Sequence, residues 1–398
     1  MRSNAAFLSA HLARQGWRYV VVDFCWSHPN PGRQDQPNQS ADLEPALAMD
    51  GYGRLLPAVE RFASAAGGAG FGPLAAHVHS LGLRFGIHVM RGVPRQAVAW
   101  DTPVLESSAS AADIADLDST CDWLNHMYGI DMRRPGAQAY YDSIFRLYAS
   151  WGVDYVKVDD MSSPYAAAEI EAVRRAIDGC GRPMVLSLSP GPAPLAQAAH
   201  LARHADLWRI SEDLWDDWTQ VEATFARCAA WAALDLPAGW PDADMLPLGR
   251  LSVRGPFPEE RSSRLTVVEQ TTLLTLFAVF RSPLMFGGDL PTSDPSVLAL
   301  LTNDDVLAVN QTGENPRQVW RDGERVVWSS EVPGTGERFV ALFNLADADG
   351  GMSVPWTALG MGERALVRDL WAGGDWTERR LALTEPVPAH GARLFRVR

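Results

Sequence analysis

Short runs of β-branched and aromatic residues alternate with segments of helical periodicity over residues 1–312. The clearest run is YVKVDD at 155–160, which follows a helical segment at 137–151 and ends abruptly in two carboxylates. Such a run is typical of a buried strand, because successive side chains of a strand point to opposite faces. We expect seven strands of this kind, at residues 19–23, 84–90, 155–160, 184–189, 207–213, 238–246 and 282–289.

The alternation of strands and helices predicts a parallel (β/α)8 TIM-type barrel. Such a barrel begins on a strand, whereas this chain begins with a helical pattern at 5–16. We therefore expect a barrel that lacks its first strand, an N-terminally incomplete catalytic domain at 1–312. Short alternating strands then follow, for example 325–328 and 339–343, and they predict a C-terminal antiparallel β-sandwich at 313–398.

The composition indicates a globular protein that does not bind nucleic acid. Of the 398 residues 47% are hydrophobic, and the formal net charge is −13 with a pI near 5.1. An acidic surface repels phosphate backbones and anionic lipids, so we expect neither a nucleic-acid nor a membrane partner. The sequence has no apolar run long enough to cross a bilayer and no signal-peptide core at its N-terminus. We expect a cytoplasmic protein, or a secreted one if the natural chain begins further upstream.

The cysteines give no sign of a disulfide framework or a zinc site. Cys25, Cys121, Cys180 and Cys228 are widely spaced without a CxxC pair, so we expect reduced thiols, mostly buried. The 15 tryptophans suit the binding of sugar rings, although most tryptophans in any protein serve packing.

Candidate chemistry is concentrated where the strands end. In a parallel barrel the active site lies at the carboxyl ends of the strands, which makes Asp159 a candidate reacting group. Lys157 lies two residues earlier and so on the same side, whereas Asp160 should face away. The alternative is that Asp159 or Asp160 caps the next helix.

Four segments together resemble the α-galactosidase (melibiase) family, family 27 of the glycoside hydrolases, over almost the whole chain. They are GWRYVVVD at 16–23 followed by Cys25-Trp26, WGVDYVKVD at 151–159, Trp208-Arg209 with Asp213, and DADML at 242–246. The resemblance implies a retaining exo-α-glycosidase, with α-galactosidase activity expected first. It also implies that Asp159 is the nucleophile and Asp213 the general acid/base.

A retaining glycosidase needs two carboxyl groups, one to attack the anomeric carbon and one to protonate the leaving oxygen, about 5–5.5 Å apart. Asp213 has close neighbours that can be mistaken for it, namely Glu212, Asp216 and Asp217. The reaction needs neither a metal nor an organic cofactor. We expect a small-molecule or oligosaccharide substrate, and the oligomeric state is open.

The resemblance further implies a set of sugar-binding residues: Asp23, Trp26, His88, Lys157, Ser189, Arg209, Asp244 and Met245. Several have a second interpretation. Trp26 can stack on a sugar or simply pack, His88 stands where the family often has Tyr, and Asp242 beside Asp244 can be a structural acceptor.

Two departures from the family pattern bear on the substrate. Phe24 replaces the second of two acids after the strand at 19–23, and Ser189 stands where α-galactosidases typically have Glu. β-L-Arabinopyranosidase, α-N-acetylgalactosaminidase and isomaltose-type α-glucosidase activities therefore remain alternatives. Two readings of another class are an inactive carbohydrate-binding remnant and a magnesium-dependent barrel enzyme, in which the strand-end acids ring a cation: Asp23, Asp159, Asp213 and Asp244.

Overall fold

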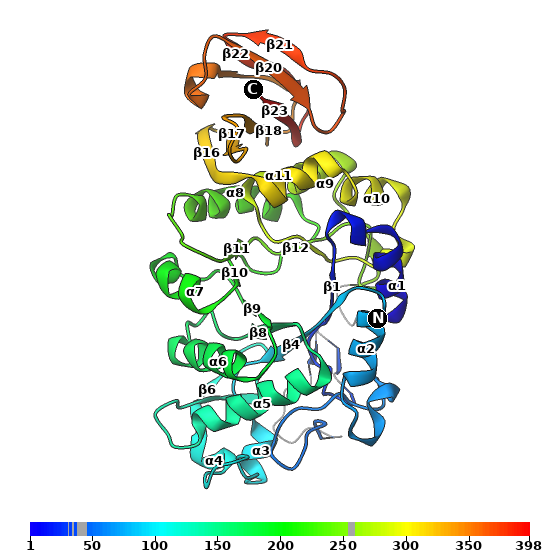
Figure 1. Ribbon diagram of the computed structural model, residues 1–398, viewed down its shortest axis with the longest axis vertical. Helices are drawn as coiled ribbons and strands as arrows, with labels where there is room; N and C mark the ends of the chain where they lie inside the picture. The colour runs from blue at the N-terminus through cyan, green and yellow to red at the C-terminus, as the bar shows by residue number, and fades with distance from the viewer. Residues whose placement is uncertain (31, 34–35, 38–45, 254–258) are drawn as a thin grey trace. The chain divides into compact units, whose positions relative to one another are not determined.

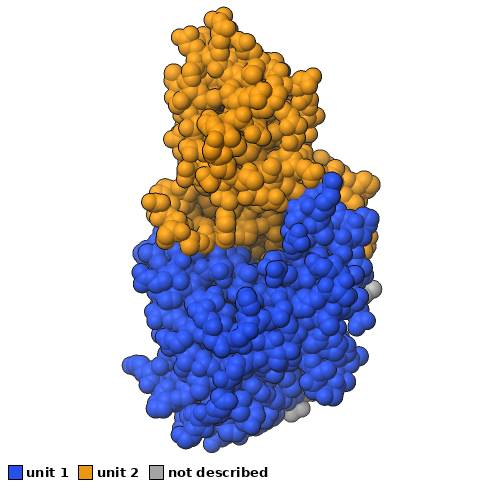
Figure 2. All heavy atoms as spheres, viewed as in Figure 1, with its two compact units in different colours: residues 1–209, 254–259 blue, residues 210–253, 260–398 orange. Residues whose placement is uncertain are grey.

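The computed structural model describes residues 1–30, 32–33, 36–37, 46–253 and 259–398. The chain divides into two compact units (Figure 2). Unit 1 spans 1–209 and 254–259, and unit 2 spans 210–253 and 260–398.

Unit 1 is built on a parallel sheet. Its strands follow one another in the order of the sequence, and each neighbouring pair is parallel. Helices lie around the outside of these strands (Figure 1). The strands are β1 (Tyr19–Val22), β4 (Arg84–Met90), β8 (Tyr155–Asp159), β9 (Val185–Leu188) and β10 (Leu207–Arg209).

A helix lies between each pair of successive strands, as parallel crossovers require. The helix α5 (Ala137–Trp151) is followed by Gly152, whose φ of +84° closes the last turn and leads the chain toward β8. The helices of unit 1 are α1 (Arg2–His11), α2 (Gly72–Ser80), α3 (Arg95–Ala99), α4 (Ala111–Ile114), α5 (Ala137–Trp151), α6 (Ala167–Gly179) and α7 (Ala198–His204), with 3-10 turns at Ala13–Gln15, Ala63–Gly68 and Leu195–Gln197.

The long excursions between the strands carry further short strands. The segment after β4, expected to be irregular at 101–135, contains the sheet β5-β7-β6. Part of the loop expected at 28–50 lies outside the described residues, namely 31, 34–35 and 38–45. The short strands are β2 (Gly32–Arg33), β3 (Gln36–Pro37), β5 (Val93–Pro94), β6 (Ala115–Thr120) and β7 (Met127–Ile130).

Unit 2 begins with helices and short strands that continue the α/β pattern. The helix α9 is apolar nearly all round and buried, and a capping box between Thr266 and Glu269 fixes its start. The strands β12 and β15 pair in parallel. The elements are α8 (Trp218–Ala232), β11 (Trp240–Asp242), β12 (Met245–Leu246), β13 (Arg250–Leu251), β14 (Arg261–Ser262), α9 (Val267–Phe280), β15 (Met285–Phe286), a 3-10 turn (Leu290–Thr292), α10 (Pro295–Leu301) and α11 (Asp304–Thr312).

The rest of unit 2 is antiparallel, as the sequence predicts. One sheet has the order β16-β17-β18-β23-β20-β21, and β19 pairs with β22. Their apolar side chains form one core around the fully buried Trp356 and Leu342. The elements are β16 (Glu314–Asp322), β17 (Arg325–Glu331), β18 (Arg338–Asn344), β19 (Gly350–Pro355), a 3-10 turn (Trp356–Leu359), β20 (Arg364–Asp369), β21 (Thr377–Arg380), β22 (Ala382–Val387) and β23 (Gly391–Val397).

The predicted fold class is confirmed, with corrections to strand ends. All seven expected strand segments contain a strand, and no strand precedes β1 in the described part of the chain. The strand expected at 207–213 ends at Arg209, and the one expected at 238–246 breaks into β11 and β12. Asp244 lies at this break with a φ of +84°, which a continuous strand does not allow. The boundary expected at 312 stays a prediction. Across the described residues no helix is long and apolar enough to span a membrane.

Candidate functional site

The sheet of unit 1 has one polar face near the carboxyl ends of its strands. His88 of β4 is in register with Lys157 of β8, and Lys157 with Ser187 of β9. Residues paired in this way point to the same face, and so does Asp159, two residues after Lys157. The opposite face carries Val89 and Val158, among other apolar side chains, and packs against α5 and α6. The alternation therefore separates polar chemistry from helix packing.

Asp159 is a buried carboxylate that is fixed through both oxygens. His88 Nε2 donates to Oδ2 at 2.9 Å, and the amide of Asp160 donates to Oδ1 at 3.0 Å. Burial opposes ionisation, but the hydrogen bond and charge of His88, the charge of Lys157 and the Ser189 hydroxyl lower the pKa of Asp159 below its ordinary value. Ser189 Oγ contributes to this lowering of the pKa, although its contact with Asp159 does not have the geometry of a standard hydrogen bond. Asp159 is thus ionised at neutral pH.

Asp23 follows β1 and adds a second carboxylate to this cluster. Asp23 is accessible to solvent although many protein atoms surround its carboxyl group, and Oδ1 accepts a hydrogen bond from the amide of Phe24 at 2.9 Å. Desolvation raises the pKa of Asp23, but Lys157, His88 and the Phe24 amide lower it overall, and the charge of Asp159 works against them. Lys157 therefore acts electrostatically on both carboxylates.

Aromatic rings lie beside the polar face. The ring of Phe24 is half-buried, with its centroid 6.1 Å from that of His88 and 6.5 Å from that of Trp123, both at steep angles. Trp123 is 43% exposed and lies in the segment between β6 and β7. The sequence shows Trp123 only as one aromatic residue in a long loop, and its place beside Phe24 emerges from the structure.

Backbone hydrogen bonds tie the ends of β8 and β9 together. The Ser189 amide donates to the Val158 carbonyl at 3.0 Å, and the Met161 amide donates to the Ser189 carbonyl at 2.8 Å. The side chain of Ser189 is 1% exposed. Ser189 thus helps to fix the turn after Asp159, whatever else its hydroxyl does.

Asp160 faces away from Lys157, as the sequence predicts, and enters a buried ionic network. Arg91 donates to Asp160 Oδ2 at 2.8 Å and to Glu169 Oε1 at 2.6 Å, and its own pKa is raised by these two carboxylates against the effect of burial. Glu169 also accepts hydrogen bonds from the Tyr141 hydroxyl and the Ile130 amide. This network supports the turn behind Asp159. Sequence reasoning missed Arg91, because a basic residue after a strand carries no signal of its own.

The predicted stacking of Trp26 on a sugar is not supported by the structure. Trp26 is 2% exposed, and its indole N–H donates to the backbone carbonyl of His88. Its ring meets those of Phe71, Tyr148 and Trp151 edge-on within an aromatic cluster. A ring enclosed in this way has no free face, so packing is the interpretation that holds.

In unit 2 the structure distinguishes Asp213 from two of the acids with which it can be confused. Asp216 is buried, forms an ion pair with Arg261 and accepts a hydrogen bond from the Arg264 amide. Asp217 is the N-cap of α8 and accepts from the Thr219 amide at 2.8 Å. Asp213 and Glu212 are both exposed.

Asp244 is a buried acceptor for the segment that carries Asp213. Asp244 Oδ2 accepts a hydrogen bond from the Leu214 amide at 2.6 Å, and Asp242 Oδ1 accepts one from the Asp244 amide at 2.9 Å. Asp242 is therefore a structural acceptor, the alternative raised by the sequence. Met245 is half-buried and packs so closely over Gly287 that a Cβ at Gly287 would lie 2.6 Å from its sulfur.

Arg209 ends β10 and is 3% exposed. Its carbonyl accepts a hydrogen bond from the Ala193 amide at 3.0 Å.

The four cysteines are all free, Cys121 and Cys228 buried and Cys25 and Cys180 half-buried. The expected burial holds for Cys121 and Cys228, and the reduced state of the thiols stays a prediction.

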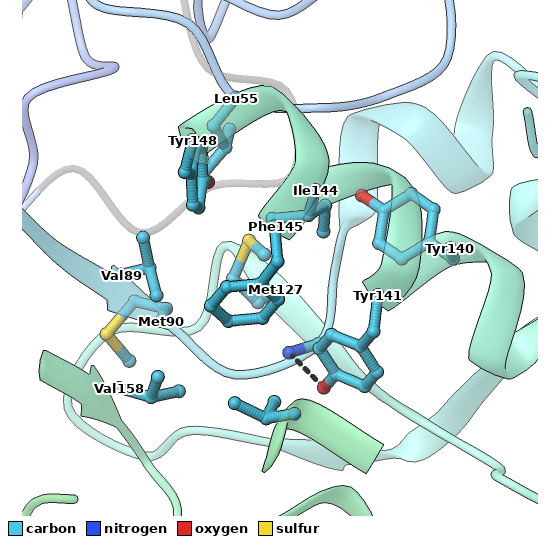
Figure 3. Close-up of a pocket in the computed structure, with 12 residues that line it drawn as sticks. Leu55, Val89, Met90, Met127, Tyr140, Tyr141, Ile144, Phe145, Tyr148 and Val158 are labelled. Atoms are coloured by element: carbon cyan, nitrogen blue, oxygen red, sulfur yellow. Dashed lines mark hydrogen bonds between the residues drawn. The ribbon is translucent and has the colours of Figure 1, made fainter. Parts of the chain in front are cut away.

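The cavity behind the polar face is too small for a sugar. It holds about 20 Å³, room for roughly one water molecule. Figure 3 shows it among apolar and aromatic side chains of α5 and the ends of β4 and β8, where the Gly92 amide donates to the Tyr141 hydroxyl at 3.1 Å. An open hollow of about 410 Å³ lies at the other, amino-terminal ends of β4 and β8 and is lined by Arg18, His79, Gly82, Leu83, Arg84, Asp154 and Arg182.

A compact group of potential metal ligands occurs in the part of the chain that the structure describes. There, the group of three or more potential ligands within 4.8 Å of one another comprises Glu171, His200 and His204, none of them at a strand end. The magnesium alternative stays a hypothesis, which the effect of a chelator on activity tests.

Comparison with known proteins places the chain among glycosidases. Residues 126–312 match the family model described as alpha galactosidase A, and 322–397 match the alpha galactosidase C-terminal beta sandwich domain. Alpha-galactosidase 3 of Arabidopsis thaliana is 28% identical over 98% of this chain and 75% of its own length, and human alpha-galactosidase A is 25% identical over 87% and 68%.

Solved structures resemble the chain over nearly its whole length. A family 27 β-L-arabinopyranosidase of Geobacillus stearothermophilus, solved in complex with arabinose, has a TM-score of 0.95 and 46% identity, covering 100% of this chain and 92% of its own. A Bacillus halodurans protein assigned as an α-N-acetylgalactosaminidase has a TM-score of 0.88 and 40% identity, with the same coverage.

The fold, the strand-end carboxylates and these matches together define a glycoside hydrolase. The chain belongs to glycoside hydrolase family 27, the family of the α-galactosidases.

Proposed function

We propose that the chain is a retaining exo-glycosidase in which Asp159 is the nucleophile and Asp213 the general acid/base. The observation that carries the proposal is the state of Asp159, a buried and ionised carboxylate held at a strand end by His88 and the Asp160 amide. A nucleophilic carboxylate must be charged and oriented before the substrate arrives. The role of Asp213 rests on its position four residues after Arg209, which matches the family motif.

The reaction proceeds in two displacements. An oxygen of Asp159 attacks the anomeric carbon while the carboxyl of Asp213 gives its proton to the departing glycosidic oxygen, which leaves a glycosyl ester on Asp159. Asp213, now a carboxylate, takes a proton from water, and the resulting hydroxide attacks the same carbon. The ester bond breaks, the sugar leaves with its original anomeric configuration, and both carboxyl groups return to their starting states.

The remaining strand-end residues serve sugar binding in this proposal. Asp23 is exposed and ionised, and it can accept hydrogen bonds from sugar hydroxyls. Lys157 donates to a hydroxyl while its charge keeps both acids ionised. Ser189, Arg209, Asp244 and Met245 keep the binding roles that the family motif implies. Asp244 and Ser189 also stabilise the turns around them.

Among the substrates left open by the sequence, we propose β-L-arabinopyranosides. β-L-Arabinopyranose has the ring hydroxyls of α-D-galactopyranose without the hydroxymethyl group, so it makes no demand for a partner to that hydroxyl. Phe24 replaces an acid of the family pattern that would accept a hydrogen bond from a sugar hydroxyl, and an apolar ring cannot accept one. We assign this missing acceptor to the hydroxymethyl group. The related β-L-arabinopyranosidase, 46% identical, supports this choice.

α-Galactosidase activity is the second candidate, because the curated relatives at 24–28% identity carry that name. α-N-Acetylgalactosaminidase activity has two observations in its favour. Ser189 replaces the Glu typical of α-galactosidases, and the Bacillus halodurans relative carries that assignment. The isomaltose-type α-glucosidase has no supporting relative among these proteins.

The proposal is tested by measuring kcat/KM on four nitrophenyl glycosides: β-L-arabinopyranoside, α-D-galactoside, α-N-acetylgalactosaminide and α-D-glucoside. We expect the arabinopyranoside to have the highest value and proton NMR to show retention at the anomeric carbon. A preference for the galactoside would overturn the substrate, and an inverted first product would overturn the mechanism.

The same purified protein tests the two hypotheses of another class, a magnesium-dependent enzyme and an inactive carbohydrate-binding remnant. Activity that disappears with EDTA and returns with magnesium would favour the cation-dependent enzyme. Protein that binds arabinose or galactose in calorimetry but hydrolyses none of the four substrates would be a carbohydrate-binding remnant.

A further inference from the structure

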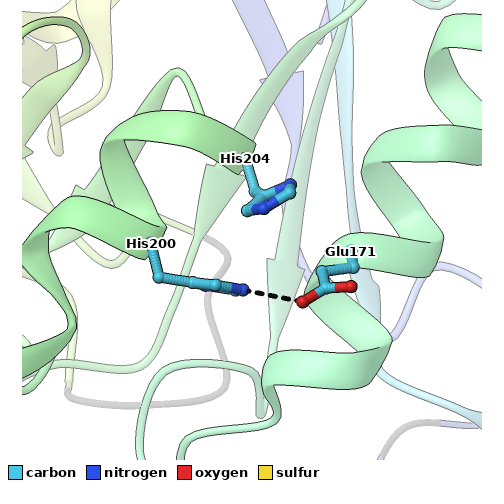
Figure 4. Close-up of side chains that lie close together, drawn as sticks. All are labelled: Glu171, His200 and His204. Atoms are coloured by element: carbon cyan, nitrogen blue, oxygen red, sulfur yellow. Dashed lines mark hydrogen bonds and ion pairs between the residues drawn. The ribbon is translucent and has the colours of Figure 1, made fainter.

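Two neighbouring helices of unit 1 bring together three side chains that the proposed reaction does not use. His200 and His204 are one turn apart on α7, and Glu171 lies on α6. Figure 4 shows their side chains converging in the space between the two helices. One potential ligand atom from each residue lies within 4.8 Å of those of the other two, and Glu171 Oε1 is 3.1 Å from His200 Nε2.

The spacing and the residue types are those of a transition-metal site. Histidines at positions i and i+4 share one face of a helix, so their rings can bind one ion together. The centroids of the two imidazole rings are 4.5 Å apart at an interplanar angle of 40°. Two imidazoles and one carboxylate suit Zn²⁺, Ni²⁺ or Cu²⁺, whereas Mg²⁺ and Ca²⁺ prefer oxygen ligands.

Tyr165 orients the ring of His200. The Tyr165 hydroxyl oxygen lies 2.6 Å from His200 Nδ1. If Nδ1–H donates to this oxygen, the lone pair of Nε2 points at Glu171 and is available to a metal. A hydrogen bond to the second ring nitrogen is the usual support of a histidine ligand in metal proteins.

The alternative is a simple surface ion pair between His200 and Glu171. That pair accounts for two of the three residues and leaves His204 without a role. No hydrogen bond involves the His204 ring within the part of the chain that the structure describes, although the ring is half-buried and faces His200 and Glu171. A metal ion would engage all three side chains.

We propose that Glu171, His200 and His204 bind one divalent transition-metal ion, with zinc as the probe, and that water completes its coordination. The ion would link α6 to α7, the helices that follow β8 and β9. The site is separate from the polar face of the sheet, because its ligands lie on the surrounding helices. Its role is therefore structural, and the proposed hydrolysis does not depend on it.

The test is zinc binding by the full chain without a histidine tag, measured by competition with a chromophoric chelator. We expect one ion per chain, and Mg²⁺ in millimolar amounts should not displace it. His204→Ala should weaken binding at least about tenfold, and Glu171→Gln and Tyr165→Phe about tenfold each. His11→Ala, which changes an exposed histidine of α1, is the matched control and should bind zinc as the wild type does.

Equal zinc affinity in the wild type and the His204→Ala variant would overturn the proposal, as would wild-type protein that binds no zinc. Thermal unfolding gives a second readout, because a ligand of the folded state raises the melting temperature. Zinc should raise the Tm of the wild type and of His11→Ala but not that of His204→Ala. Hydrolysis by His204→Ala without zinc should equal that of the wild type, so failure of this site leaves the proposed glycosidase reaction untouched.

Discussion

The His88 Nε2 atom lies 2.9 Å from Asp159 Oδ2, and both side chains are buried on the same face of the sheet. The register of β4 with β8 places His88 beside Lys157, one layer below Asp159. The hydrogen bond therefore runs diagonally between neighbouring strands. This bond links Asp159 to His88, a residue of the regular strand β4 that helps to keep Asp159 ionised.

Replacing Asp159 tests the proposed nucleophile directly. Asp159→Ala should lower kcat at least about 10³-fold, because no covalent intermediate can form. Azide should restore part of the activity by attacking from the vacated side and should yield a glycosyl azide of inverted configuration. The measurement is hydrolysis of the best nitrophenyl substrate with and without azide.

Asp213→Ala is the companion variant. It should retain much more activity on substrates with good leaving groups than on those with poor ones, since a good leaving group needs no proton. The same loss on both kinds of substrate in the Asp159 and Asp213 variants would contradict the assigned roles. Glu212→Ala is the matched control, because Glu212 is the exposed acid beside Asp213.

The hydrogen bond from His88 should shape the acid limb of the pH–rate profile. His88 helps to lower the pKa of Asp159, so without it that pKa rises and activity is lost at a higher pH on acidification. His88→Phe should move the acid limb to higher pH and lower kcat/KM by about 10- to 100-fold, the value of a hydrogen bond to a charged group. His88→Tyr differs from it by one hydroxyl that can donate to Asp159, and should move the limb less. Identical profiles for the two variants would show that the ring matters and the hydrogen bond does not.

Phe24 should decide between arabinopyranosides and galactosides. Phe24→Asp supplies an acceptor for the extra hydroxyl of a galactoside and should raise the ratio of kcat/KM for α-galactoside over β-L-arabinopyranoside by about 10- to 100-fold. Phe24→Leu, which stays apolar, is the control and should leave the ratio near that of the wild type. A ratio that responds equally to both changes would point to lost packing against His88 and Trp123 instead.

The buried network around Arg91 should contribute strongly to stability. Arg91→Met leaves Asp160 and Glu169 buried without their cation, and should lower the free energy of unfolding by about 3–5 kcal/mol. The measurement is urea unfolding followed by circular dichroism. Arg146→Met is the control, because the pair of Arg146 with Glu106 is exposed and should be worth at most about 1 kcal/mol.

His28 should make the folded state sensitive to acid. Burial, aided by the charge of Arg61, lowers the pKa of His28 from 6.5 to about 4. Between these two values the unfolded chain takes up a proton that the folded chain does not, so stability falls as the pH drops through this window. The loss is about 3 kcal/mol for a shift of this size.

His28→Phe removes this titration and should reduce the loss of stability between pH 7 and pH 4 by a comparable amount. Part of the slope should remain, because burial also holds the pKa of His126 well below its ordinary value. Urea unfolding at several pH values makes the measurement, and an unchanged slope in His28→Phe would contradict the account.

The sequence predicts the strands and helices of this protein better than its turns. Alternation and helical spacing locate all seven strand segments, because burial of one face of each element imposes a period that is visible in the sequence. The same alternation predicts correctly that Asp160 points away from Lys157. It cannot predict the break at Asp244, since a φ of +84° there depends on hydrogen bonds to Asp242 and Leu214.

Side-chain roles at the site are harder to predict from the sequence, because burial depends on partners that are distant in the chain. In the sequence Trp26 is a candidate for stacking on a sugar, and only its contacts with Tyr148 and Trp151 of α5 reveal a packing role. Asp216 and Asp217 are indistinguishable from Asp213 by residue type, and their partners Arg261 and Thr219 separate them. The separation of Asp159 from Asp213 stays a prediction.

The hydrogen bond from the Leu214 amide to Asp244 has a consequence for how this segment can vary. The amide belongs to the residue directly after Asp213. Its acceptor is the buried side chain of Asp244, whose backbone has a φ of +84°. Substitutions in the turn leave that backbone donor in place. An added or deleted residue would move the Leu214 amide away from Asp244 and would displace Asp213 as well. Natural variants of this turn should therefore differ in amino-acid sequence but have the same number of residues.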